Sequence, residues 1–417
     1  MADNLLDQAS IILTPTASDV SKVLCVKPSE APFGDFDFSR ATEATRINSQ
    51  GLVETIGINL PRINYEGFSF DGSGNVVPDS GCGSWLWESQ STNLITQSED
   101  LTSWSNSGST LTSGLTSPSG DNTAYSVLSG SGTSNRVQLT TNGLSVSTEH
   151  SVSVFVKKVG TDNKATLLFE TTETGRQGVS FNFDTKILSN ASGTTSNRQV
   201  QQLTNDWFRI SYTFTTAATI TSPNIQLNRS NPSQAAIYWG AQVEAGNISS
   251  YIPTEGATVT RNQDLCTNGG SLASINSTEG VLYAEIAALA NDLTQRQISI
   301  DDGTGTNRII LRYNNVSNNI NAYLFSGSVQ GGELNFIASD ITQFNKIAFS
   351  YKQNEFKLFV NGTQRAIDTS GNTFSPNTLN DLSFDFNGGF PFFGKTKALA
   401  VWKEALSDSE LTELTTI

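Results

Sequence analysis

The sequence predicts an all-β protein made of two jelly-roll β-sandwiches in tandem after a small, irregular N-terminal module. Segments that alternate apolar and polar residues recur along the chain, turn residues separate them, and almost no segment has helical periodicity. Charged residues make up only 15% of the 417 residues, and Ser, Thr, Asn and 34 Gly take their place. The predicted domains are residues 1–90, 91–264 and 275–417.

The N-terminal module is expected to be too broken by Gly and Pro to build a large core alone. Apolar residues cluster near its start, and Pro15 ends any helix there. We expect this arm to anchor the protein on a partner, although a local core segment would show the same pattern. If the arm is an anchor, deletion of residues 1–30 leaves the sandwiches soluble. The expected anchoring residues are Leu5, Leu6, Ile11, Ile12 and Leu13.

The first sandwich is predicted from strand-like runs between residues 91 and 264. Apolar and polar residues alternate over 152–157, 208–214 and 236–243. A turn-forming segment, Gly160 to Asn163, follows the first of these runs. Strands at this spacing, without helical segments between them, favour a jelly roll.

The second sandwich, residues 275–417, is predicted from the same kind of pattern and ends in a helix. A run from Glu355 to Val360 leads into Asn361-Gly362, a pair typical of two-residue hairpin turns. Near the end of the chain, Ser407 and Glu410 have the spacing of a capping box. We therefore expect a hairpin at Asn361-Gly362 and a short helix after Ser407.

Composition excludes several classes of function. Lys and Arg number 25 and Asp and Glu 39, so the net charge is 25 − 39 = −14, which argues against a nucleic-acid binder. No apolar run is long enough to span a membrane, and we expect no membrane contact. His150 is the only histidine, so His-based catalysis is not expected. The three cysteines lack metal-site or redox spacing: Cys25, Cys82 and Cys266.

Four blocks stand out from the rest of the chain: residues 5–15; 38–46 with 51–53 and 61–63; 91–101 with Trp104; and 239–246 with 250–254 and 260–261. They resemble bacteriophage virion proteins of the tail-fibre, spike and head-fibre type, and the first block is similar to proteins of Bacteroidetes phages. The resemblance implies a virion structural protein that is synthesised in the cytoplasm of the host bacterium. It also implies other virion proteins as partners and a homotrimer.

The C-terminal region is similar to concanavalin A-like and laminin G-like domains. The similarity lies in Phe349-Ser350-Tyr351, in Leu358 to Gly362, and in Gly394-Lys395 before Val401-Trp402. It implies a lectin-like jelly roll. The middle domain is expected to be a jelly roll of the carbohydrate-binding-module kind. The Glu-x-Asp-x-Glu run of related glucanases is absent, so we expect no enzyme activity.

Loops of the second sandwich combine aromatic rings with amide side chains. Rings stack on the apolar faces of sugars and amides bind sugar hydroxyls, so these loops are the expected glycan-binding site. Polar loop decoration would show the same residues. The expected site consists of Tyr313, Asn314, Asn315, Asn318, Phe386, Asn387 and Phe390.

An acidic, Gly-rich turn begins with Asp301 and Asp302. Calcium favours oxygen-rich loops of this kind, so the turn is a candidate Ca²⁺ site, although a plain hairpin turn explains it equally. No other cofactor is expected.

We expect a phage fibre or spike protein that projects from the particle and binds host cell-surface polysaccharide. One alternative is a purely structural capsid decoration or connector. A second alternative is a polysaccharide depolymerase.

Overall fold

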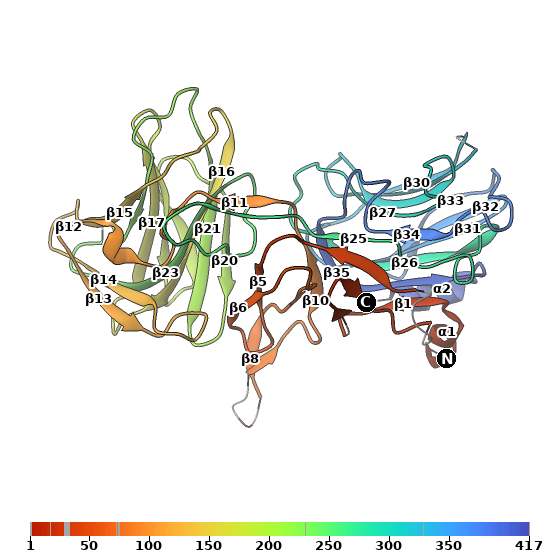
Figure 1. Cartoon of the computed structure of the whole chain (residues 1–417), viewed down its shortest axis with the longest axis horizontal. Coiled ribbons are helices and arrows are strands. Elements are labelled where there is room, and N and C mark those ends of the chain that lie inside the picture. Colours follow the sequence, from red (N-terminus) through yellow and green to blue (C-terminus); the bar gives the residue numbers. More distant parts are fainter. Residues whose placement is uncertain are drawn as a thin grey trace.

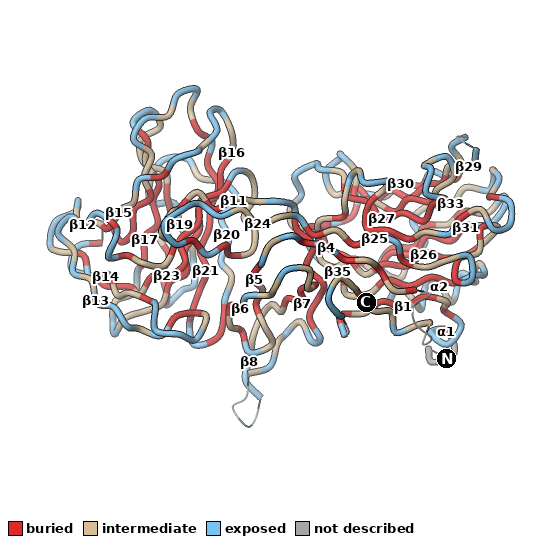
Figure 2. Tube along the Cα trace, viewed as in Figure 1, coloured by how far each residue is buried: buried red, intermediate tan, exposed pale blue. Residues whose placement is uncertain are grey.

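The protein consists of two β-rich lobes that meet at a narrow crossing (Figure 1). Almost all regular structure is β, as predicted, and buried residues fill the interior of both lobes (Figure 2). The two α-helices in the described part of the chain are short, and neither is long and apolar enough to cross a membrane. The computed structural model describes residues 2–16, 18–28, 34–71, 73, 76–229, 231–327 and 329–416.

The first sandwich has two antiparallel sheets, each of six strands among the described residues. Alternate side chains of both sheets, such as Val154, Phe181 and Ile210, point inward into one apolar cluster. One sheet has the order β12 (Ser105–Ser107), β15 (Arg136–Thr140), β22 (Asn224–Leu227), β17 (Lys164–Thr171), β18 (Gly175–Asn182), β19 (Ile187–Ser192). The other has the order β13 (Ser109–Leu115), β14 (Ala124–Ser129), β23 (Ala235–Ala245), β16 (Glu149–Lys158), β21 (Trp207–Thr215), β20 (Ser196–Gln202).

The second sandwich packs a smaller sheet against a larger one around a second apolar cluster. The smaller sheet has the order β30 (Val329–Ile337), β29 (Asn319–Ser326), β28 (Arg308–Tyr313), β27 (Arg296–Asp301), β34 (Asp381–Ser383). The larger sheet has the order β33 (Thr363–Asp368), β32 (Glu355–Val360), β31 (Asn345–Lys352), β26 (Glu279–Ala288), β35 (Gly394–Trp402), β10 (Ser84–Trp87), β7 (Ile63–Asn64).

A hairpin turn and a helix cap form in the second sandwich where the sequence predicts them. Asn361 and Gly362 form a two-residue turn between β32 and β33, with φ of +50° and +73°. Ser407 caps helix α2 (Asp408–Thr415): its hydroxyl accepts from the Glu410 N–H, and the Glu410 side chain reaches back to the Ser407 N–H.

The N-terminal segment belongs to the second sandwich. Helix α1 (Ala2–Gln8) leads into β1 (Ile11–Leu13), which pairs antiparallel with residues 399–401 of β35. Strand β10 pairs with residues 394–396 on the same edge of β35, and β26 occupies its other edge. Strands from opposite ends of the chain therefore complete one sheet.

This placement corrects the expected anchoring role of the N-terminal apolar residues. Ile11 and Leu13 are fully buried in the core of the second sandwich, and Leu5 is buried against Trp402, whose indole N–H donates to the Leu5 carbonyl at 2.9 Å. Ile12 is half-buried, and only Leu6 is exposed among the five. Most of this apolar surface is satisfied inside the chain, so it is not available to a partner.

Four small sheets also form among the residues that the structure describes. In one of them, a strand that follows the first sandwich, β25, pairs with β4 of the N-terminal segment. The four sheets are β2 (Ser18–Asp19), β3 (Lys22–Val23), β4 (Phe36–Ser39), β25 (Leu265–Thr267); β5 (Ala44–Ile47), β6 (Val53–Ile56); β8 (Phe68–Phe70), β9 (Val76–Pro78); and β11 (Ser91–Asn93), β24 (Val259–Arg261). A single 3-10 turn in the described chain, Leu101–Ser103, precedes β12.

The first sandwich is consequently an insertion between two parts of the second. The chain leaves the second sandwich at Glu88 and returns at Asp264. These two residues are bonded to each other: the Asp264 N–H donates to the Glu88 carbonyl at 2.9 Å, and the Glu88 N–H donates to Asp264 Oδ2 at 2.8 Å. The two crossing points are thus held side by side.

A buried group of five charges, which we term the charge hub, occupies the crossing. Asp264 accepts from Arg40 at 3.0 Å and from Arg62 at 2.5 Å, and Glu88 lies 2.8 Å from Arg62 and 3.5 Å from Arg261. Burial alone would raise the pKa of Glu88, but the charges of Arg261 and Arg62 outweigh it and lower that pKa to about 2. Three guanidinium groups share two carboxylates, so every charge of the hub depends on its neighbours.

Candidate functional site

Three loops of the second sandwich hold most of the expected glycan-binding residues, and we term them the rim: residues 289–295, 314–318 and 386–391. The first connects β26 to β27, and the second connects β28 to β29. The third follows β34 and is fixed beside β27, because the Phe390 carbonyl accepts from the Gln297 N–H at 3.1 Å. The rim therefore contains most of the expected glycan-binding residues, but Phe386 and Asn387 lie toward Gly305 and Arg308, at the far end of β28 from residues 314–318.

Amide side chains tie the first two rim loops together. Gln295 Nε2 donates to Asn314 Oδ1 at 2.9 Å, and Asn291 Nδ2 donates to Ser317 Oγ at 2.8 Å. Asn291 Oδ1 also accepts from the Asn318 N–H at 3.2 Å. These bonds fix the loops without help from a buried core, which is the kind of support that a preformed binding surface requires.

Three exposed apolar side chains project from the rim. Leu293, Val316 and Phe390 are 53%, 51% and 55% exposed, one on each loop. Leu293 and Phe390 have φ of +62° and +52°, the left-handed region that side chains with a Cβ rarely adopt. Such a conformation costs about 1–2 kcal/mol per residue, so the loops hold these side chains outward at the expense of stability.

The remaining residues of the third loop have different roles. The Arg308 guanidinium lies 4.7 Å from the centroid of the half-buried Phe386 ring and 3.9 Å from that of Phe325. Phe386 therefore packs on a cation and is a support of the loop. Asn387 is exposed at the tip of the turn, with φ of +50°.

Tyr313, one of the expected glycan-binding residues, lies in the core and not on the rim. Its ring is fully buried in the core of the second sandwich, and its hydroxyl donates to the Ile286 carbonyl at 2.9 Å. Burial raises the pKa of the hydroxyl far above its usual value. Asn315, two residues later, is exposed, and Asn314 and Asn318 are half-buried on the rim.

The acidic turn gives no support to a calcium site. Asp301 is buried, and its carboxylate accepts from the Gly303 N–H and the Ser299 hydroxyl. Asp302 accepts from Thr304 and Asn307, as in an ordinary turn. Within the described residues there is no group of three or more His, Cys, Asp or Glu side chains that could hold a metal ion.

Three aspartates lie beneath the third rim loop. Asp301 and Asp381 are cross-strand partners on β27 and β34, and Asp385 follows on the same strand face as Asp381. Burial, reinforced by the negative charges of Asp381 and Asp301, raises the pKa of Asp385 to about 6. The ionised form of Asp385 is therefore disfavoured by the folded state.

Replacing Asp385 with asparagine is expected to raise the Tm at pH 7.5 and to leave it almost unchanged at pH 4. The folded-state pKa of about 6 lies above the usual 3.8, so the native protein loses stability as pH rises between these values, and the neutral amide removes that loss. Calorimetry at the two pH values measures the difference. Asp206→Asn, at an exposed position, is the control, and an equal gain at both pH values would contradict the expectation.

Comparison with solved structures finds distant similarities. The chain resembles the CBM40 module of the Ruminococcus gnavus IT-sialidase bound to α2,3-sialyllactose, with 21% identity and a TM-score of 0.30, over 34% of this chain and 83% of that one. It also resembles domain 4 of AbnA, a GH43 extracellular arabinanase from Geobacillus stearothermophilus, solved with arabinotriose, with 15% identity and a TM-score of 0.31, over 41% and 82%.

A protein-family model matches one part of the chain. No curated protein matches the sequence. Residues 273–412 match the model of the concanavalin A-like lectin/glucanases superfamily, Laminin_G_3. The second sandwich thus contains a concanavalin A-like, laminin G-like domain, and all three rim loops lie within the matched residues.

Proposed function

We propose that this protein is a non-enzymatic phage virion protein that binds host surface glycans through the rim of its second sandwich. One observation carries the proposal: the rim holds the exposed Phe390 ring in a strained backbone conformation, and its other two loops carry hydrogen-bonded amide side chains. An aromatic ring stacks on the apolar face of a sugar, and amides donate to and accept from its hydroxyls.

The strain at Phe390 favours a binding role over loop decoration. A glycine or asparagine would adopt φ of +52° at lower cost, so a bulky ring at this position is retained against the preference of the backbone. Exposed apolar groups that cost stability are typical of binding surfaces. The concanavalin A-like match over residues 273–412 supports a lectin-like use of this domain.

The virion location and a homotrimeric state are part of the same proposal, and the resemblance of four sequence blocks to phage virion proteins supports them. Antibody labelling of purified virions tests the location, and light scattering tests the oligomeric state. Labelling at an exposed projection is the expected result. A protein that is enclosed between capsid or tail proteins would instead be a connector.

Replacing Phe390 with alanine is expected to weaken binding to host polysaccharide about tenfold, because loss of one stacked ring removes roughly 1.4 kcal/mol. The Tm should stay constant or rise, since the ring is 55% exposed. Surface plasmon resonance with purified host polysaccharide and the full chain measures the affinity. Val329→Ala, at an exposed position on the opposite end of the same sandwich, is the matched control. Equal affinities of both variants would refute the rim site.

A further inference from the structure

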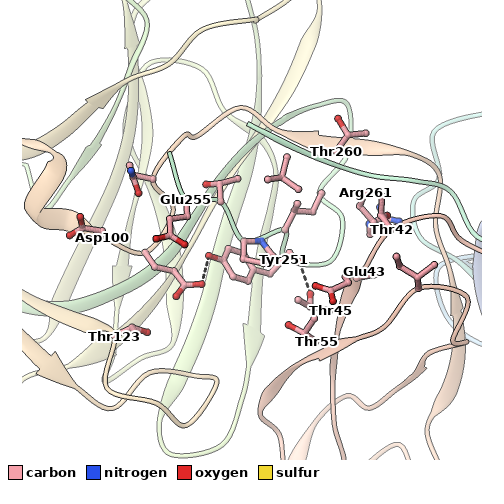
Figure 3. Close-up of a pocket in the computed structure, with 18 of the residues that line it drawn as sticks. Thr42, Glu43, Thr45, Thr55, Asp100, Thr123, Tyr251, Glu255, Thr260 and Arg261 are labelled. Atoms are coloured by element: carbon pink, nitrogen blue, oxygen red, sulfur yellow. Dashed lines mark hydrogen bonds between the residues drawn. The ribbon is translucent and has the colours of Figure 1, made fainter. Parts of the chain in front are cut away.

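A large pocket lies between the first sandwich and the small sheet of β5 and β6 (Figure 3), and no residue of the rim lines it. Its volume is about 900 Å³, at the upper end of the range for small-ligand sites. Four segments form most of its wall, of which the last two are close together in sequence: residues 41–45, 97–100, 251–255 and 259–261.

Tyr251 forms the inner wall and joins both sides of the pocket. Its hydroxyl donates to Glu99 at 3.0 Å and contacts Ser98 at 2.7 Å, both on the side of the first sandwich. Its backbone carbonyl accepts from the Thr45 hydroxyl at 2.5 Å, on the side of β5 (Figure 3). Because the two sides are bonded through one residue, the pocket is formed before any ligand arrives.

The lining is strongly acidic. Glu43, Glu99, Asp100 and Glu255 contribute four carboxylates, and Arg261 is the one cation among the lining residues, so the formal sum is −4 + 1 = −3. Arg261 is buried and committed to the charge hub, where it lies 3.5 Å from Glu88. An anionic ligand would meet uncompensated negative charge in this pocket.

Part of the hydrogen-bonding capacity of the pocket is unused. The side chains of Glu43, Thr55 and Glu255 are exposed and form no hydrogen bond or ion pair with any other residue that the structure describes. Carboxylates are acceptors that match the hydroxyl and amino groups of a polyhydroxylated ligand. Ile58 and Val259, which are 54% and 40% exposed, provide apolar surface beside them.

We propose that this pocket is a second saccharide-binding site, which takes a non-acidic oligosaccharide segment, either uncharged or bearing amino groups. Its volume accommodates several sugar units, its free carboxylates accept from hydroxyl and ammonium groups, and its charge excludes uronic and sialic acids. The site shares no residue with the rim, and its existence does not depend on glycan binding there.

The test uses the full chain and three probes: a glucosamine tetrasaccharide, its N-acetylated counterpart and a galacturonate tetrasaccharide. Isothermal titration calorimetry at low salt should show binding of the first two and none of the third. Thr55→Trp fills the pocket at an exposed strand position without a change of charge, and it should weaken binding about tenfold or more. Glu255→Lys should weaken the glucosamine probe most, whereas Glu404→Lys, exposed on the second sandwich, is the matched control.

The outcomes separate this site from the rim. Binding that Thr55→Trp abolishes and Phe390→Ala leaves intact supports the pocket, even if the rim binds nothing. Binding of galacturonate as tight as that of the neutral probe would overturn the proposal. Failure of both non-acidic probes to bind, or equal binding by the wild type and Thr55→Trp, would overturn it as well.

Discussion

Replacing Asp264 with asparagine is expected to lower the free energy of unfolding by about 3–5 kcal/mol, the usual cost of removing one partner from a buried ion pair. Asp264 is buried and pairs with both Arg40 and Arg62. The asparagine keeps the shape of the side chain but leaves three buried guanidinium groups with Glu88 as their one carboxylate in the hub. Urea unfolding of the full chain measures the change.

The matched control for this prediction is Asp184→Asn. Asp184 also forms a close ion pair, with Lys158 at 2.5 Å, but the Lys158 and Asp184 side chains are 35% and 53% exposed. Solvent screens an exposed pair of this kind, so the control should be nearly neutral. Equal changes of the unfolding midpoint for Asp264→Asn and Asp184→Asn would show that the charge hub does not stabilise the fold.

Deletion of residues 1–13 is expected to make the chain aggregate. The deletion removes β1, uncovers one edge of β35 at residues 399–401, and empties the core positions of Ile11 and Leu13. An uncovered apolar strand edge is a template for pairing with other chains. Size-exclusion chromatography of the expressed variant measures the outcome. This expectation replaces the one drawn from sequence, in which the N-terminal arm is a dispensable anchor.

Single substitutions test the same feature without loss of backbone. Ile11→Ala should lower the free energy of unfolding by about 2–5 kcal/mol, since a fully buried side chain is truncated. Leu6→Ala should have little effect, because Leu6 is 48% exposed on α1. A soluble, monodisperse deletion variant together with a neutral Ile11→Ala would return the arm to the role of an anchor.

The elements that depend on local sequence were predictable. Period-2 alternation identified long strands such as β16 and β21, because one face of each strand meets an apolar core. The turn at Asn361-Gly362 and the cap at Ser407 follow from the backbone preferences of those residues alone. None of these predictions required knowledge of a distant partner.

The partners of the strands were not predictable. The pairing of β1 with β35 joins residues about as far apart as the chain allows, and no pattern within either strand names the other. The pocket depends on four separate segments for the same reason. The charge hub is hidden too, because a buried arginine such as Arg62 looks like a surface residue in sequence.

The burial of Tyr313 was predictable from the sequence. Ile309, Leu311 and Tyr313 are alternate residues of β28, and all three are buried. The same alternation that predicted the strand places Tyr313 on its core face. Leu293 and Val316 were missed because isolated apolar residues in polar loops carry no periodic signal.

The charge hub draws its arginines from separate parts of the sequence. Arg40 and Arg62 precede the first sandwich, and Arg261 follows it. The hub therefore joins the segments through which the chain enters and leaves the first sandwich.

The reciprocal bonds between Glu88 and Asp264 also have a consequence for the evolution of the protein. Both strands that enter and leave the first sandwich pass through one point, where backbone and carboxylate bonds hold them in a fixed spacing. At that point a sandwich of different size or specificity could replace the first one. The strand register of the sheet that receives it would be preserved. The crossing is therefore a fixed attachment point for the inserted sandwich.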